Sequence, residues 1–231
     1  MWILFAFGSA LFAGLTSILA KCGIKNTDSN AATAIRTIIV LIFSWIMVFL
    51  VGAQHGIGSV SAKTWTFLIL SGLATGASWL CYFRALQIGD VDKVVPVDKS
   101  SAILSILLAF IFLHESISPL KLLCVVLIGV GTYLMITKKG TSSENSGKKG
   151  WSCSAIFASL TSILGKVGIE NIDSNLGTAI RTIVVLIMAW IVVFVTKKQD
   201  SVRTIDHREL GFICLSGLAT GASWLCYYRA L

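Results

Sequence analysis

The sequence predicts an all-α, multi-pass membrane helix bundle of about eight transmembrane helices, built from inverted five-helix repeats of which the second is truncated. Composition, the spacing of charged residues and an internal repeat support this prediction. The 231-residue chain is 55% hydrophobic and 13% charged, whereas a soluble domain carries about 25% charged residues. Its mean hydropathy is +0.84. This composition excludes a disordered chain and an ordinary soluble domain.

Charged residues are spaced so that eight long uncharged stretches lie between them. A helix needs about 20 mostly apolar residues to cross a bilayer, and basic side chains at its ends can reach the interface. Transmembrane strands are disfavoured because runs such as Ile38–Phe49 do not alternate polar and apolar residues. We expect helices near 2–21, 31–52, 65–88, 94–113, 119–137, 151–168, 176–196 and 209–230.

The first expected helix, 2–21, could be mistaken for a secretory signal. Its start, Met1–Leu4, carries no basic residue, and no cleavage site is followed by a polar mature domain. In addition, Leu15–Leu19 recurs deep in the chain as Leu160–Leu164, where no signal peptide can lie. We therefore expect a permanent helix.

The next helices have recognisable starts and ends. In the helix 94–113, Pro96 suits the first turn, and Asp98 and Lys99 follow it. Pro119 begins the fifth helix. A polar, glycine-rich segment, 138–150, then separates a five-helix repeat at 1–137 from a partial repeat of three helices at 151–231.

An internal repeat relates the two halves of the chain at a distance of 145 residues. Leu15–Leu86 matches Leu160–Leu231 without a gap, with 43 identities in 72 positions. The longest shared block, Leu70–Tyr82, recurs unchanged at Leu215–Tyr227. The helices 151–168, 176–196 and 209–230 are therefore expected as second copies of the first three.

An odd number of helices in one repeat places the second copy in the opposite orientation. In the first copy, the segments after helices one, three and five carry eight lysines, and the opposite side carries only Lys63 and Lys121. The positive-inside rule then predicts an outside N-terminus. The loop 197–208 carries four Lys and Arg residues, where its counterpart in the first copy carries Lys63 alone, which fits a copy of opposite orientation.

Several blocks resemble the EamA domain of the drug/metabolite transporter superfamily, and are most similar to its short bacterial single-domain members. The blocks are Leu15–Lys21, Asp28–Thr37, Leu70–Leu86, Val94–Ser101 and Leu113–Ser116. The resemblance implies a secondary transporter of small metabolites or drugs in the cell (inner) membrane. Its partners would be the lipid bilayer and a small-molecule substrate, moved by alternating access between inverted repeats.

The second copy stops at Leu231, the counterpart of Leu86, so nothing in it corresponds to residues 87–137. The alternative to a transporter is therefore a truncated, non-transporting membrane protein, or a subunit completed by another chain. A homodimer is one form of such a complex.

Charged residues inside the expected helices are the first candidates for substrate binding. They are Arg36, its repeat Arg181, Asp98 and Lys99. Charges at this depth are costly and tend to line a protein interior or a water-filled cavity. The alternatives are that the arginines extend to the interface and that Asp98 only favours a helix N-terminus. Adjacent helical residues point about 100° apart, so Asp98 and Lys99 need not pair.

Aromatic residues and glycines complete the set of candidates. Trp79, Tyr82, Trp224 and Tyr227 could line a substrate cavity or lie in interfacial belts. Gly72 and Gly76, repeated as Gly217 and Gly221, predict close helix packing. The first expected helix, 2–21, carries no carboxylate side chain, and the lack of such a negative charge favours neutral or anionic substrates.

Other functions lack the residues that they require. The sequence presents no catalytic constellation, so an enzyme is not expected. Six dispersed cysteines and three distant histidines predict neither a metal site nor a cofactor. Basic residues lie at helix ends and form no basic face, which disfavours nucleic acid as a partner.

Overall fold

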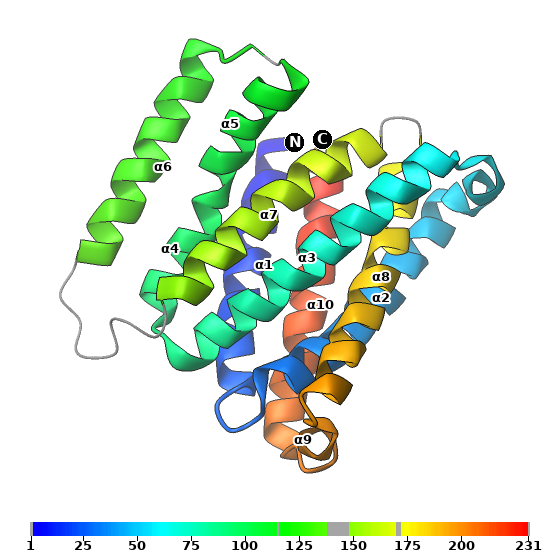
Figure 1. Ribbon diagram of the computed structural model, residues 1–231, viewed down its shortest axis with the longest axis vertical. Helices are drawn as coiled ribbons and strands as arrows, with labels where there is room; N and C mark the ends of the chain where they lie inside the picture. Colours follow the sequence, from blue (N-terminus) through cyan, green and yellow to red (C-terminus); the bar gives the residue numbers. More distant parts are fainter. Residues whose placement is uncertain (1, 115, 138–147, 170–171, 231) are drawn as a thin grey trace. The chain divides into compact units, whose positions relative to one another are not determined.

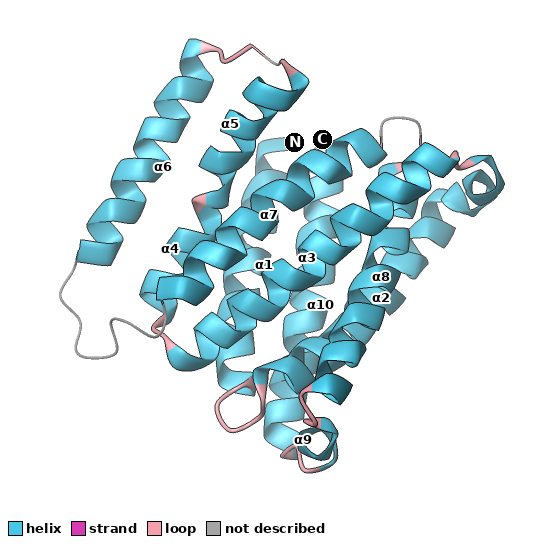
Figure 2. Ribbon diagram, in the orientation of Figure 1, coloured by secondary structure: helices cyan, strands magenta, loops and turns pink. Residues whose placement is uncertain are grey.

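The computed structural model describes residues 2–114, 116–137, 148–169 and 172–230, and these residues form helices and loops without a strand (Figures 1 and 2). The elements are α1 (Trp2–Gly23), α2 (Ser29–Val51), the 3₁₀-helix η1 (Ala53–Ser59), α3 (Ala62–Ile88), α4 (Val91–Lys99), α5 (Ser101–Leu113), α6 (Pro119–Thr137), α7 (Lys148–Gly168), α8 (Ser174–Val195), α9 (Gln199–Arg203) and α10 (His207–Ala230).

Five stretches of the described chain are long and apolar enough to cross a membrane. They are Ile3–Gly23, Ser29–Val51, Ala62–Ile88, Val91–Leu113 and Ser174–Val195, and two shorter apolar helices lie at Pro119–Met135 and Cys153–Gly168. The predicted all-helical class is therefore confirmed. Most of the predicted boundary segment 138–150 lies outside the described residues.

Aspartate side chains set the starts of α2 and α8. The carboxylate of Asp28 accepts the Asn30 amide at 2.9 Å, and that of Asp173 accepts the Asn175 amide at 2.8 Å. Each carboxylate satisfies an amide that has no partner within its own helix. Both helices consequently begin two residues earlier than the sequence analysis placed them.

The expected helix 94–113 is divided at Ser100 into α4 and α5. It begins at Val91, so Pro96 lies inside α4 and its predicted place in the first turn is wrong. Proline has no amide to donate and its ring crowds the preceding turn. The Ser100 hydroxyl also donates to the Val97 carbonyl at 2.6 Å, which competes with the helical hydrogen bonds.

The chain forms two compact units, and each contains helices of both repeats. Unit 1 comprises Met1–Val60 and Ile172–Leu231, and unit 2 comprises Ser61–Asn171. In unit 1, α1 packs against α10; in unit 2, α7 packs against α3. Because α7 repeats α1 and α10 repeats α3, both units use the same pair of helices.

Serine and threonine hydroxyls join the two helices of each pair, and we call these contacts the hydroxyl interface. In unit 1, Ser216 donates to the Thr16 carbonyl at 3.0 Å, Ser223 donates to the Ser9 carbonyl at 2.8 Å, and Thr16 meets Thr220 at 3.2 Å. In unit 2, Ser71 donates to the Thr161 carbonyl at 3.0 Å, Ser78 donates to the Ser154 carbonyl at 3.1 Å, and Thr75 meets Thr161 at 3.3 Å. Each contact in one unit has its counterpart 145 residues away in the other.

The equivalent helices α2 and α8 pack together in unit 1 and run antiparallel. Gly56, just after α2, lies beside Leu176 at the start of α8. At the other ends, the ammonium group of Lys198, just after α8, lies 3.9 Å from the carboxylate of Asp28, just before α2. The two copies of this helix therefore point in opposite directions.

Close packing of α10 on α2 requires glycine at two positions. A Cβ atom on Gly217 would lie 3.0 Å from the Cβ of Ile39, and one on Gly221 would lie 2.5 Å from the ring of Phe43. Because these two positions carry no side chain, α10 approaches α2 closely enough for other residues of α10 to form polar contacts.

We predict that Gly221→Ala lowers the thermal unfolding midpoint of the detergent-solubilised protein, because the added methyl group overlaps Phe43. Overpacking of this kind costs about 1–3 kcal/mol. Gly211→Ala is the control, since a Cβ there meets nothing within 4 Å. Equal midpoints for the two variants would contradict the packing of α10 on α2.

Candidate functional site

Arg36 lies on α2, seven residues after the helix begins and about 10 Å along its axis. Its side chain is buried, with 4% of the residue exposed. Nε donates to the Ser216 hydroxyl at 3.2 Å, and Nη2 donates to the Thr220 hydroxyl. The guanidinium group of Arg36 therefore faces α10.

The contacts of Arg36 connect three helices of unit 1. Ser216 and Thr220 on α10 bond to Arg36 on α2 and to Thr16 on α1. Hydroxyl oxygens accept hydrogen bonds from the charged group and so replace the water that it loses on burial. The repeat residue, Arg181, is half-buried on α8.

Asp98 lies at a second polar cluster, in unit 2. It sits seven residues after the start of the span Val91–Leu113, and its side chain is 14% exposed. One carboxylate oxygen accepts the Ser154 hydroxyl of α7 at 2.6 Å. Ser154 also belongs to the hydroxyl interface, where its carbonyl accepts the Ser78 hydroxyl. The cluster thus connects α4 to the packed pair α3 and α7.

Lys99 completes this cluster. Its ammonium group lies 3.5 Å from the second carboxylate oxygen of Asp98, and its side chain is 64% exposed. The sequence did not predict this ion pair, because the side chains of adjacent helical residues point about 100° apart. The long lysine side chain spans that angle and contacts the carboxylate from the open side of the helix.

The aromatic candidates have different surroundings. Trp224 lines a cavity of about 10 Å³ together with Phe43, Met47 and Asn175, which is room for about one water molecule. The Oδ1 atom of Asn175 is buried there without a hydrogen-bond partner.

The remaining candidates are distributed over both units. Tyr82 is buried and Trp79 half-buried on α3. Gly72 and Gly76 are also buried on α3. Tyr227 belongs to α10, and its side chain lies outside the described residues. Of the predicted substrate residues, the structure places Asp98 and Lys99 in contact with each other.

Sequence analysis did not single out Glu209, which is 7% exposed at the start of α10. Its carboxylate accepts the backbone and side-chain N–H groups of Asn26 at 3.0 and 2.8 Å, and the amide and hydroxyl of Thr27. It therefore ties the loop between α1 and α2 to α10. The repeat contained a signal for this contact, because both partners differ between the two copies: Glu209 stands where the first copy has Thr64, and Thr27 stands where the second copy has Ile172.

Apolar helices of spanning length, with an arginine and an aspartate bonded inside them, define a multi-pass membrane protein. Residues 1–137 match the EamA-like transporter family, and the chain belongs to this family. The predicted family is therefore confirmed. It is a family of membrane transporters that is not known to catalyse reactions.

A curated relative matches a stretch of the chain of similar length. It is described as an uncharacterized transporter in the cobO 3' region of Sinorhizobium sp, and it is 41% identical over 134 residues. The match spans 58% of this chain and 95% of the relative. That relative thus corresponds to about one repeat.

We predict that Arg36→Lys lowers the thermal unfolding midpoint, because one ammonium group cannot donate from two separate nitrogens to Ser216 and Thr220. The loss should correspond to about 1–3 kcal/mol, as for a buried polar group left unsatisfied. Arg84→Lys is the control, since Arg84 is exposed on α3 and bonds to Gln87. An unchanged midpoint in Arg36→Lys would contradict the buried role of the guanidinium group.

Proposed function

We propose that the chain is a secondary transporter of small metabolites or drugs in the cell (inner) membrane, and that it works by alternating access between inverted repeats. The family supports transport. The antiparallel arrangement of α2 and α8 carries the proposal of inversion, since these helices are copies of one sequence. Inverted repeats have two related conformations, open to opposite faces of the membrane.

The repeat boundaries in this proposal are 1–137 and 151–231, joined by the segment 138–150. The repeated contacts of the hydroxyl interface support it, because each pairs the first helix of one repeat with the third of the other. The bundle then has about eight transmembrane helices. The α7 and α10 helices serve as spans alongside the longer apolar stretches.

Substrate binding is assigned to the intramembrane polar and aromatic residues. They are Arg36, Arg181, Asp98, Lys99, Trp79, Tyr82, Trp224 and Tyr227. Asp98 is the best supported, because it lies inside a span and contacts both a lysine and a hydroxyl. A carboxylate so placed can exchange a proton or accept a donor group of the substrate. The nearby cations favour neutral or anionic substrates.

A second candidate function is that of a subunit completed by another chain. The relative spans about one repeat, so proteins of this kind need not carry two repeats on one chain. In addition, Ile163 of α7 is half-buried, whereas its equivalent on α1, Ile18, is 56% exposed. On α7, α5 covers the face that carries Ile163. The equivalent face of α1 is therefore available to lipid or to a further helix.

We predict that the purified protein in liposomes accumulates members of a panel of labelled neutral or anionic metabolites when a pH gradient is imposed. Asp98→Asn should reduce the initial rate at least about tenfold, because the carboxylate is lost. Asp92→Asn on the same helix is exposed and should leave the rate unchanged.

Three results would count against this proposal or a part of it. No uptake above that of protein-free liposomes would contradict transport by the chain alone and favour the second candidate. Uptake with equal rates in both variants would contradict the role of Asp98. Lipophilic cations as the best substrates would contradict the expected substrate class.

A further inference from the structure

Two cysteines lie close together in unit 2, on the packed helices α3 and α7. The thiols of Cys81 on α3 and Cys153 on α7 are near enough to interact electrostatically. Both are free thiols in this structure, and Cys81 is half-buried whereas Cys153 is exposed. The proposed transport site includes neither of them, so the pair calls for an explanation of its own.

The hydroxyl interface aligns the two thiols. Successive hydrogen bonds along α3 reach successively earlier residues of α7, so the two helices run antiparallel. Near one end of the interface, Ser78 donates to the Ser154 carbonyl at 3.1 Å. Cys81 follows Ser78 by three residues and lies on the same face of α3. Cys153 directly precedes Ser154, so both thiols lie at this end of the interface.

The internal repeat indicates the spacing of the two positions. Gly8 on α1 and Cys226 on α10 are the equivalents of Cys153 and Cys81. A Cβ atom on Gly8 would lie 3.8 Å from the Cβ of Cys226 and 3.3 Å from its Sγ. The flanking serine hydrogen bond is repeated as well, at 2.8 Å in unit 1 and 3.1 Å in unit 2. We therefore expect a similar spacing for Cys153 and Cys81, and disulfides have Cβ atoms about 3.8 Å apart.

The surroundings of Cys153 are accessible to water. The apolar stretch of α7 begins at this residue, so its thiol lies where the hydrocarbon of the bilayer ends. The neighbouring Ser154 donates to Asp98, which pairs with Lys99, and the Lys99 side chain is 64% exposed. A water-soluble oxidant can thus reach Cys153 first, while the half-buried Cys81 serves as the second thiol.

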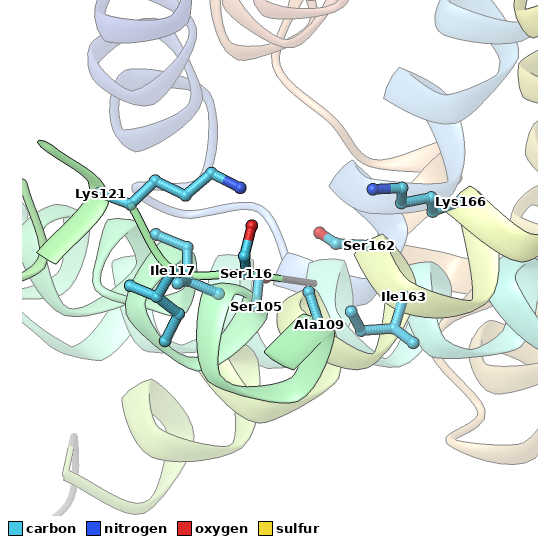
Figure 3. Close-up of a pocket in the computed structure, with 9 residues that line it drawn as sticks. Ser105, Ala109, Ser116, Ile117, Lys121, Ser162, Ile163 and Lys166 are labelled. Atoms are coloured by element: carbon cyan, nitrogen blue, oxygen red, sulfur yellow. The ribbon is translucent and has the colours of Figure 1, made fainter. Parts of the chain in front are cut away.

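A cavity elsewhere in unit 2 is a separate feature. It measures about 180 Å³ and lies between α5, the start of α6 and the end of α7 (Figure 3). On α7 it is lined by Ser162, Ile163 and Lys166, and its lining in the described part of the chain includes no cysteine. Ser162 lies nine residues after Cys153, about 13 Å along the helix axis. Neither thiol therefore belongs to this cavity.

We propose that Cys81 and Cys153 form a redox site, at which hydrogen peroxide oxidises the two thiols to a disulfide that joins α3 to α7. The Cys153 thiolate attacks the O–O bond, becomes a sulfenic acid and releases hydroxide. The Cys81 thiolate then attacks that sulfur, and the S–S bond forms as a second hydroxide leaves. Each hydroxide takes up one thiol proton, so two thiols and one peroxide yield one disulfide and two waters.

The test treats the purified full chain with a stoichiometric amount of hydrogen peroxide, blocks the remaining thiols with N-ethylmaleimide and maps disulfide-linked peptides by mass spectrometry. We expect a linkage between the peptides that contain Cys81 and Cys153, and maleimide on the other cysteines. Dithiothreitol should then restore labelling of both. Absence of this linkage, or irreversible oxidation of Cys153 beside a free Cys81, would overturn the proposal. No transported substrate is needed, so the result is independent of the proposed function.

Two variants test whether the reaction is specific to this pair. The wild type should form its linkage at least about tenfold faster than Cys81→Ser forms any disulfide, because neighbouring thiols react within one molecule. Cys214→Ser, a change of another half-buried cysteine, should leave that rate unchanged. Equal rates in the wild type and Cys81→Ser, with equal thermal unfolding midpoints, would contradict a specific pair.

The repeat supplies a positive control. Gly8→Cys in the Cys81→Ser chain places a second thiol beside Cys226 and should restore peroxide-dependent linkage, now between α1 and α10. Failure of this variant to form the linkage, with an unchanged thermal midpoint, would contradict the spacing inferred from the repeat.

Discussion

Hydrogen bonds between serine and threonine side chains on neighbouring helices are the interaction on which the rest of this structure depends. Lipid tails are as apolar as leucine, so apolar side chains alone give helices little reason to associate in a bilayer. Here, serine hydroxyls on α10 donate to backbone carbonyls of α1, and the equivalent serine hydroxyls on α3 donate to backbone carbonyls of α7. Both intramembrane charged clusters are built on this hydroxyl interface. Ser216 and Thr220 also bond to Arg36, and Ser154 also bonds to Asp98.

The two repeats use the same interface but carry different additions. Ser154 of α7 meets the carboxylate of Asp98, whereas its equivalent, Ser9, meets Ser223 of α10. Conversely, Glu209 fixes the loop before α2, and its equivalent position holds Thr64. A duplicated scaffold thus keeps the contacts that join helices and acquires different polar groups around them. Such differences can give the two faces of a transporter unequal stability, although its framework is repeated.

Sequence alone predicted the helices well because membrane spans leave a long apolar signal and the repeat doubles it. It also singled out Arg36 and Asp98, because charges are rare inside apolar stretches. It could not predict their partners, since Ser216, Thr220 and Ser154 are ordinary polar residues whose role depends on which helices meet. The break at Ser100 was missed because the sequence analysis began this helix at residue 94, which put Pro96 in the first turn, where proline is tolerated. The pairing of α1 with α10 was not predicted either, because serine and threonine residues in the sequence do not reveal which helices meet.

Inversion of the second repeat is the central claim, and the sidedness of two equivalent exposed positions tests it most directly. His55, just after α2, and Asp200, just after α8, are 145 residues apart and both exposed. Each is replaced singly by cysteine in a cysteine-free chain and treated in intact cells with a membrane-impermeant maleimide. The account predicts labelling of His55→Cys in intact cells, and of Asp200→Cys only after the membrane is permeabilised. Identical labelling of both positions would contradict inverted repeats and, with them, the proposed alternating access.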